Sequence, residues 1–142
     1  MRSQQLIDKL NLIPHPEGGF YRETYRSEME LNFDGFEGKR NIGTSIFFLM
    51  KGGQATLPHR IKSDEIWFYQ DGSNCEIVEL NNDGTERIIQ LGSDLENGQV
   101  YQHVVKAGVW FYTRVNPEFE YCLAACHVNP GFDFQDFEIQ IT

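Results

Sequence analysis

The sequence predicts an all-β domain, a sandwich or a barrel, preceded by one short helix. Short runs rich in aromatic and β-branched residues follow one another from Phe20 onward, most restarting after roughly 9–12 residues. Gly, Asn, Asp and Pro separate these runs, and no helical pattern alternates with them. The length of 142 residues fits one domain over residues 1–142.

The expected helix lies at the start of the chain. Leu6, Ile7 and Leu10 recur at helical spacing, Ser3 is placed to cap the helix, and Pro14 ends the pattern. Pro14 therefore marks the point where the β domain begins.

The expected strands follow the helix in order. They are Phe20–Arg26, Thr44–Met50, Thr56–Ile61, Glu65–Gln70, Cys75–Leu80, Glu86–Leu91, Val100–Val105, Val109–Arg114, Glu118–Val128 and Asp133–Ile139. Asp83-Gly84 between two of these runs is a strong hairpin signal. The polar, glycine-punctuated segment Ser27–Asn41 is expected to be a surface loop.

Charge and composition exclude several classes of partner. Twelve Lys and Arg residues against 21 Asp and Glu residues give a net charge of −9, which disfavours nucleic acid and anionic membrane surfaces. No apolar run is long enough to cross a membrane, and no secretory signal is visible. Three cysteines without a C-x-x-C spacing indicate free thiols, so a cytoplasmic location is expected.

One spacing in the chain points to a functional site. The sequence has no dinucleotide fingerprint, P-loop, H-E-x-x-H pair or G-x-S-x-G elbow. The stretch from Gly53 to Gly72 reads G-x5-H-x-I-x3-E-x6-G, with His59, Ile61 and Glu65 at its defining positions. Strand alternation places residues 59 and 61 on one face, and Glu65, across a tight turn, is expected to face the same interior.

This stretch resembles the first motif of the cupin superfamily, in which a second histidine stands at the position of Ile61. The second cupin motif is matched loosely by Lys106–Phe111, with Phe111 where a third histidine would stand. Of the four ligand positions only His59 and Glu65 remain, whereas iron sites of this kind need three protein ligands and structural zinc needs four. We therefore expect no metal and no cofactor.

Three further segments, Pro16–Tyr25, Thr44–Leu49 and Pro130–Glu138, are similar to the metal-poor cupin family of unknown function known as the cupin-5 type. The family-like core covers residues 13–138. The resemblance implies a single cupin jelly-roll barrel that usually forms a homodimer. It also implies a pocket similar to that of dTDP-sugar 3,5-epimerases, but no established reaction.

His59, Glu65 and Tyr69 are the candidate catalytic residues. A carboxylate that points into a barrel is costly unless it is paired, so Glu65 is expected to pair with His59 and to raise the histidine pKa. His59 would then suit general-base work, although a hydrogen-bonded core histidine is the alternative. Trp67 and Tyr69 share the face of Glu65, either as core or as an aromatic platform for a ligand. Tyr69 is also the candidate proton donor.

The other ligand-binding candidates are Tyr21, Arg22, Ser45, Phe47, Arg60, Phe111 and Phe134. The run containing Tyr21 and Arg22 is similar to one that contacts the nucleotide-sugar phosphate in sugar epimerases, with a solvated strand face as the alternative. Arg60 would add positive charge at the pocket mouth. Ser45 and Phe47 rest on family likeness, and Phe111 and Phe134 either line the pocket or fill the core.

Two functions are consistent with these residues. The favoured one is a small-molecule-binding cupin whose ligand is carbohydrate-like or aromatic. The alternative is a metal-free epimerase or isomerase acting on a sugar or nucleotide-sugar, with His59 as the base, Glu65 orienting it and Tyr69 returning the proton. His15 is expected in a loop, and His103 and His127 in structural roles.

Overall fold

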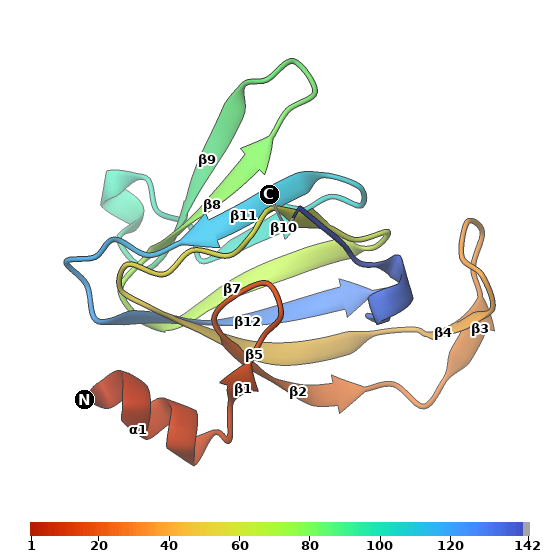
Figure 1. Ribbon diagram of the computed structural model, residues 1–142, viewed down its shortest axis with the longest axis horizontal. Coiled ribbons are helices and arrows are strands. Elements are labelled where there is room, and N and C mark those ends of the chain that lie inside the picture. Colours follow the sequence, from red (N-terminus) through yellow and green to blue (C-terminus); the bar gives the residue numbers. More distant parts are fainter. Residues whose placement is uncertain (141–142) are drawn as a thin grey trace.

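The computed structural model describes residues 1–140 and has the all-β architecture that the sequence predicts (Figure 1). Its helices are α1 (Arg2–Lys9), η1 (Leu95–Asn97) and η2 (Phe134–Asp136). Its strands are β1 (Ile13–Pro14), β2 (Phe20–Arg26), β3 (Glu30–Asn32), β4 (Lys39–Asn41), β5 (Thr44–Lys51), β6 (His59–Arg60), β7 (Asp64–Gly72), β8 (Cys75–Leu80), β9 (Glu86–Leu91), β10 (Gln102–Val105), β11 (Trp110–Arg114), β12 (Tyr121–Asn129) and β13 (Glu138–Ile139).

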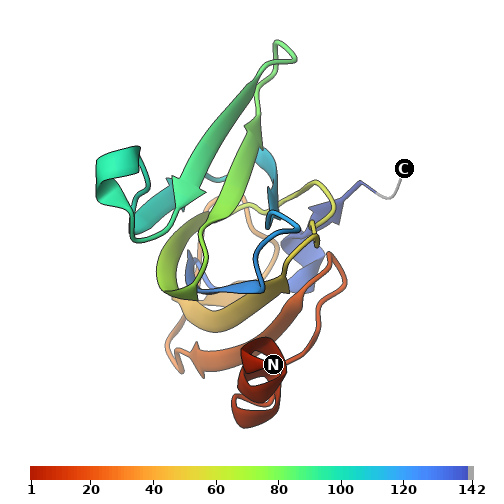
Figure 2. The same ribbon diagram turned by 90° about the vertical axis from the view of Figure 1, so that its left-hand side faces the viewer.

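Two antiparallel sheets form the jelly-roll barrel. The larger has the strand order β1-β2-β5-β12-β7-β10 and the smaller has the order β13-β6-β11-β8-β9. Seen from its end, the molecule is a ring of strands, with the β8–β9 hairpin extending beyond the ring (Figure 2). Among residues 1–140, no helix has the length and apolar character needed to cross a membrane.

The main core lies between the two sheets. Phe48 of β5, Trp67 of β7 and Phe111 of β11 meet there, each at most 2% exposed. Burial of a side chain of this size stabilises the fold by about 2–3 kcal/mol. The opposite face of β5 carries Leu49, which packs with Ile7 of α1 in a second cluster. The amphipathic helix therefore covers part of the outer face of the larger sheet.

The strand predictions are confirmed most closely where alternation and turn chemistry agree. β2, β8 and β9 have the predicted bounds. At the tip of the β8–β9 hairpin, Asn81 N donates to Thr85 O at 2.8 Å, and Gly84 adopts a positive φ of 86°. A residue without a Cβ is favoured in this conformation, which explains the hairpin signal at Asp83-Gly84.

The strand prediction is wrong at three places, and Ser3 does not cap the helix, because it lies inside α1, whose N-cap is Met1. Ser27–Asn41 is not simply a loop, because it contains the β3–β4 hairpin. Thr56–Ile61 pairs as a strand only at His59–Arg60. The predicted strand Asp133–Ile139 begins instead with η2, because the Asp133 carboxylate accepts a hydrogen bond from Gln135 N at 3.0 Å and caps that turn.

A buried ion pair fixes η2 beside the barrel. Arg40 of β4 donates to both carboxylate oxygens of Asp136, at 2.8 and 2.9 Å. Both residues are buried, with Arg40 4% and Asp136 7% exposed. A bidentate pair fixes direction as well as distance, so the β3–β4 hairpin positions the segment that carries Phe134.

Replacing Arg40 should therefore destabilise the protein strongly. In Arg40→Met the Asp136 carboxylate stays buried without its partner, whereas in Arg60→Met an exposed pair with Glu138 and a surface stacking contact with Trp110 are lost. We expect the melting temperature to fall roughly threefold more in Arg40→Met than in Arg60→Met. Equal losses in differential scanning calorimetry would show that the Arg40–Asp136 pair does not hold this segment.

Candidate functional site

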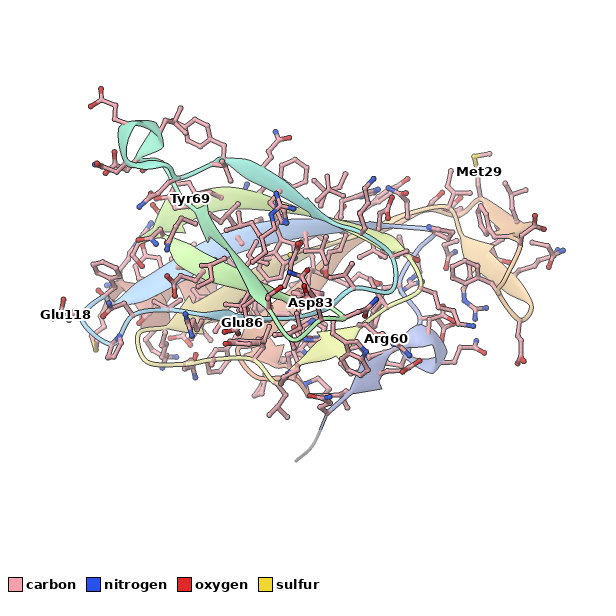
Figure 3. All side chains as sticks on the ribbon, turned by 90° about the horizontal axis from the view of Figure 1, so that it is seen from above. Met29, Arg60, Tyr69, Asp83, Glu86 and Glu118 are labelled. Carbon is pink, nitrogen blue, oxygen red and sulfur yellow. The ribbon has the colours of Figure 1, made fainter. Side chains whose placement is uncertain are left out.

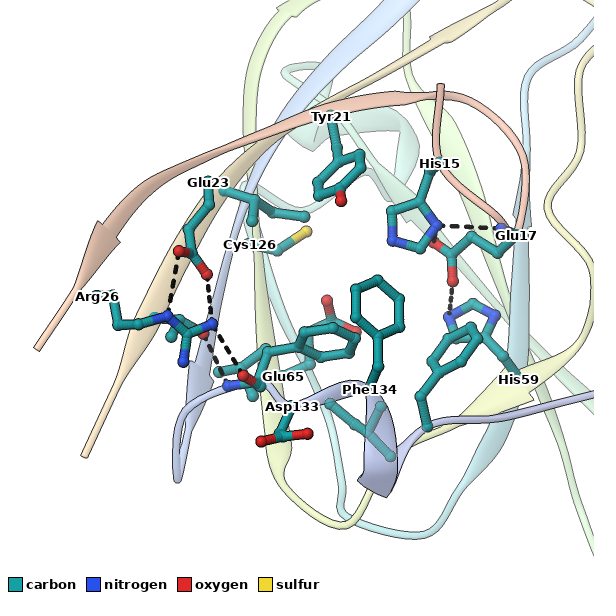
Figure 4. Close-up of a pocket in the computed structure, with 16 residues that line it drawn as sticks. His15, Glu17, Tyr21, Glu23, Arg26, His59, Glu65, Cys126, Asp133 and Phe134 are labelled. Carbon is teal, nitrogen blue, oxygen red and sulfur yellow. Dashed lines mark hydrogen bonds and ion pairs between the residues drawn. The ribbon is translucent and has the colours of Figure 1, made fainter. Parts of the chain in front are cut away.

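A cavity of about 480 Å³ opens between the sheets at the end of the barrel next to η2 (Figure 4). Strands β2, β5, β6, β7 and β12 supply part of its wall, and the turn before β2, the residue that follows β6 and the segment around η2 supply the rest. The lining residues are His15, Glu17, Tyr21, Glu23, Arg26, Thr44, Ile46, His59, Ile61, Glu65, Cys126, Val128, Phe132, Asp133, Phe134 and Phe137.

His59 is buried at one side of this cavity and forms an ion pair with Glu17. Its Nε2 lies 2.8 Å from Glu17 Oε2, and its Nδ1 lies 2.8 Å from the Leu57 carbonyl oxygen. A carbonyl only accepts, so Nδ1 carries a proton and the pair with Glu17 places a second proton on Nε2. Burial alone would lower the pKa of His59, but Glu17, the Leu57 carbonyl and Glu65 together raise it above 6.5.

Glu17 is held by the turn between β1 and β2. Its carbonyl oxygen accepts from Leu57 N at 2.8 Å, and its N–H donates to His15 Nδ1 at 3.1 Å. Gly18 follows with a φ of 113°, which favours glycine. Because His15 Nδ1 accepts a hydrogen bond, the proton of the neutral ring lies on Nε2. Burial lowers the pKa of His15 and His59 adds to this, although Glu17 opposes it.

Glu65 points its carboxyl group into the cavity from the start of β7 (Figure 4). Burial, followed by the charge of Glu17, raises its pKa to about 7, while His59, Trp67 and Cys126 act in the opposite direction. The buried indole N–H of Trp67 makes no well-formed hydrogen bond within residues 1–140. Among those residues, no basic side chain forms an ion pair with Glu65.

The predicted pairing of His59 with Glu65 is therefore wrong. Glu17 occupies the position that Glu65 was expected to take, and Glu65 keeps its carboxyl group directed toward the cavity. Glu17 is 42 residues from His59 in the chain, so no local spacing links the two. The only signal was that Glu17 lies in the segment Pro16–Tyr25, which carried part of the family resemblance.

Aromatic rings form the wall opposite the β-sheet residues. Phe132 and Phe134 have ring centroids 4.8 Å apart, and Phe134 and Phe137 have centroids 5.9 Å apart. The ring of His15 joins this wall to Tyr21, because it lies 6.4 Å from the Phe134 ring and 4.5 Å from the Tyr21 ring. Phe134 is 51% exposed although it is a large apolar side chain, so its ring is open to a ligand.

Of the residues predicted from the sequence, His59, Glu65, Tyr21 and Phe134 line the cavity. Trp67 and Phe111 do not, because they are buried in the core behind it. The Phe111 ring is packed 4.3 Å from the ring of His59. These two aromatic residues therefore support the cavity wall from inside the barrel.

Ser45, Phe47 and Arg22 lie on the outer face of the larger sheet, which corrects their predicted place in the pocket. Thr44 and Ile46 line the cavity, so their neighbours on β5 face the other way. Arg22 is opposite Phe47 in the β2–β5 register and shares its outward face. Ser45 Oγ instead lies 2.9 Å from Nδ1 of His127, the neighbouring residue on β12.

Tyr69 and Arg60 also lie outside the cavity lining. Tyr69 is four residues beyond Glu65 on the same extended strand, about 13 Å along it. Its hydroxyl donates to Gly72 O at 2.6 Å, and it lies toward the end of the molecule opposite Met29 (Figure 3). Arg60 bonds to Glu138 and stacks over the Trp110 ring at 4.8 Å. The proton-donor role expected for Tyr69 therefore has no support from its position.

The metal site of the cupin type does not fit these residues. Ile61 and Phe111 supply no ligand atoms, and both ring nitrogens of His59 are engaged by Glu17 and Leu57. Within residues 1–140, no group of three or more His, Cys, Asp or Glu side chains is placed to hold a metal ion. The donor set is thus too small for the common iron and zinc sites.

Purified protein should accordingly hold divalent metal only weakly. After dialysis against a chelator and then against buffer, we expect iron, manganese and zinc far below one equivalent per chain. Elemental analysis by mass spectrometry measures this directly. A value near one equivalent that falls in Glu65→Gln would contradict the assignment.

Comparisons with known proteins agree with the fold and identify the family. The family model described as Cupin superfamily (DUF985) matches residues 4–140. An uncharacterized protein of Saccharomyces cerevisiae is 32% identical over 145 residues, which cover 94% of this chain and 72% of the yeast protein.

Two solved structures are also similar over most of their length. A hypothetical protein of Leishmania major has a TM-score of 0.89 at 32% identity, covering 96% of this chain and 86% of that one. A protein of Shewanella oneidensis has a TM-score of 0.86 at 37% identity, covering 96% of this chain and 83% of that one. The chain therefore belongs to the cupin superfamily, in the family described as DUF985.

Proposed function

We propose that this protein binds a small molecule in the barrel cavity, against the carboxyl group of Glu65. The observation that carries the proposal is the combination of a cavity of about 480 Å³ with one acidic group that is directed into it and has no ion-pair partner among residues 1–140. A mostly apolar cavity with a few convergent polar groups is typical of ligand sites. Phe134 and Tyr21 would contact the body of the ligand, which favours an aromatic or otherwise flat, apolar one.

Binding of a small molecule in this cavity can be tested by filling the cavity with a larger side chain. Ile46 lines the cavity from β5. The larger side chain in Ile46→Phe should therefore fill part of the cavity without changing its charge. We expect small aromatic compounds that raise the melting temperature of the wild type to lose that effect in Ile46→Phe. Leu57→Phe, at an exposed position outside the cavity lining, is the matched control and should respond like the wild type. Equal responses of all three proteins would place the binding elsewhere.

A second candidate function is metal-free proton transfer, as in an isomerase acting next to a carbonyl group. One observation favours it: a carboxyl group with a pKa of about 7 faces the cavity, and such a group transfers protons well near neutral pH. Glu65 is then the base, since His59 already carries both of its protons. Glu65 would take the proton from the carbon next to the carbonyl, and the resulting enolate would regain a proton on the same or the neighbouring carbon.

The nucleotide-sugar version of this candidate has less support. It needs positive charge for a phosphate, but Arg22 lies on the outer face and Arg60 bonds to Glu138. Exchange of solvent deuterium into small ketones and keto-sugars tests the reaction itself. Exchange that is lost in Glu65→Gln and kept in Tyr69→Phe would support catalysis, whereas binding without exchange would leave only the binding function.

We further propose that the protein forms a homodimer through the outer face of the larger sheet. Phe47, Phe68 and Val104 lie on that face and remain partly or fully exposed, because α1 covers only one part of it. An exposed apolar sheet face is a frequent site of association between copies. Sedimentation should show a dimer at micromolar concentration and a monomer in Phe68→Glu, and a monomeric wild type would contradict the proposal.

A further inference from the structure

We propose that the cavity selects a ligand carrying a positive charge, such as an amine or a quaternary ammonium group on an aromatic or apolar body. This inference rests on the proposed small-molecule function and names the chemical class of the ligand. It follows from the distribution of charge around the cavity, from the hydrogen bonds that already engage Arg26, the one arginine in the described lining, and from the aromatic wall.

Carboxylates outnumber permanent cations in the cavity lining. Four acidic side chains, Glu17, Glu23, Glu65 and Asp133, face one guanidinium group, that of Arg26. Glu17 is neutralised by the imidazolium of His59 at 2.8 Å. After the pairs are matched, Glu65 and Asp133 remain as the acidic groups that a ligand would meet.

Arg26 is not available to hold an anion. Its Nε and Nη2 donate to the two carboxylate oxygens of Glu23 at 3.1 and 2.6 Å. Nη2 also donates to the carbonyl oxygen of Phe132 at 3.0 Å, and Nη1 donates to Asn41 Oδ1 at 2.7 Å. A ligand phosphate or carboxylate would have to displace these bonds, and it would also approach Glu65 and Asp133, which form no ion pair within residues 1–140. Anionic ligands are therefore disfavoured.

The aromatic residues that line the cavity favour the binding of a cation. The rings of Phe132, Phe134 and Phe137 lie within about 6 Å of one another, and Tyr21 stands across the cavity (Figure 4). Ring faces carry negative electrostatic potential and attract ammonium groups, most strongly where water is excluded. Glu65 faces the same space and has no ion-pair partner within residues 1–140, so a ligand cation can supply the missing charge.

The protonation state of Glu65 should change when a cation binds beside it, and this change can be measured. The groups that act on it are Glu17, which raises its pKa, and His59, Trp67 and Cys126, which lower it. Without a ligand its pKa of about 7 leaves it roughly half protonated at neutral pH. A bound cation favours the carboxylate, so binding at pH 7 should release about half a proton per chain, whereas a neutral ligand should release none.

Three probes of nearly the same size separate the ligand classes: benzylammonium, benzyl alcohol and benzoate. Isothermal titration calorimetry at pH 7 in two buffers of different ionisation enthalpy measures affinity and proton release together. We expect benzylammonium to bind about tenfold more tightly than benzyl alcohol, and benzoate to bind most weakly. Glu65→Gln should weaken benzylammonium by about tenfold and abolish proton release, while leaving benzyl alcohol nearly unchanged.

Glu118→Gln removes an exposed carboxylate at the far end of the molecule and is the matched control (Figure 3). It should leave all three affinities unchanged. If benzyl alcohol or benzoate binds as well as benzylammonium, the charge preference is overturned while the binding function stands. If none of the probes binds and Ile46→Phe changes no thermal response, the binding function fails with it.

Discussion

Glu65→Gln should stabilise the ligand-free protein by about 2–3 kcal/mol at pH 8. The pKa of Glu65 is raised from 4.5 to about 7 by burial and by Glu17, so the folded protein favours the protonated carboxyl group. The stability that this group contributes is fully present below pH 4.5 and is lost as the pH rises through about 7. A glutamine, which is never charged, avoids that loss.

The expected signature is the pH dependence of the difference between the two proteins. Urea unfolding at pH 4 should give nearly equal free energies of unfolding, and the advantage of Glu65→Gln should grow until about pH 7 and then level off. Glu118→Gln, which removes an exposed carboxylate, should show no such trend. A gain of equal size at pH 4 and pH 8 would mean that the charge of Glu65 is not the cause.

Glu17→Gln should destabilise the protein by about 2 kcal/mol at pH 6, and by less once the pH has risen through the raised pKa of His59. Glutamine keeps the shape of the side chain but cannot balance the buried imidazolium of His59. The pKa of His59 is raised, so its contribution to stability is present below 6.5 and is lost as the pH rises through the folded value. The variant therefore loses most where the wild type holds the charged pair.

Two readouts check this account of the pair. Urea unfolding gives the cost at each pH, and NMR titration of the His59 ring should show its pKa falling in Glu17→Gln, because burial, the largest effect, is then opposed only by the Leu57 carbonyl and Glu65. Glu79→Gln, which removes the partner of His103 outside the cavity lining, is the control and should leave the His59 titration unchanged. An unchanged His59 titration would show that Glu17 does not set its charge.

The fold was predictable because its determinants are local. Alternating apolar residues and turn residues fix β2, β8 and β9, and the spacing from Gly53 to Gly72 places His59 and Glu65 around one interior. Alternation patterns fail to predict the structure where a side-chain hydrogen bond changes the backbone conformation. The Asp133 carboxylate starts η2 in a stretch whose residues otherwise favour a strand.

The site was only partly predictable because its decisive contacts join distant segments. Glu17 reaches His59 across the barrel, and strand periodicity in the sequence does not say which residues of β5 face inward. Tyr69 was expected in the pocket because it shares a strand face with Glu65. It does not line the cavity, because it lies four residues farther along the extended strand. Such distances depend on tertiary structure and not on periodicity.

The proposed site depends above all on the protonation of Glu65, and carbon NMR of the glutamate side-chain carboxyl groups measures it most directly. One resonance should titrate near pH 7, disappear in Glu65→Gln, and move to a lower pKa when benzylammonium is added. If every glutamate in the wild type titrates below about pH 5, the cavity holds no acid of the kind proposed here, and the binding mode built on it is wrong.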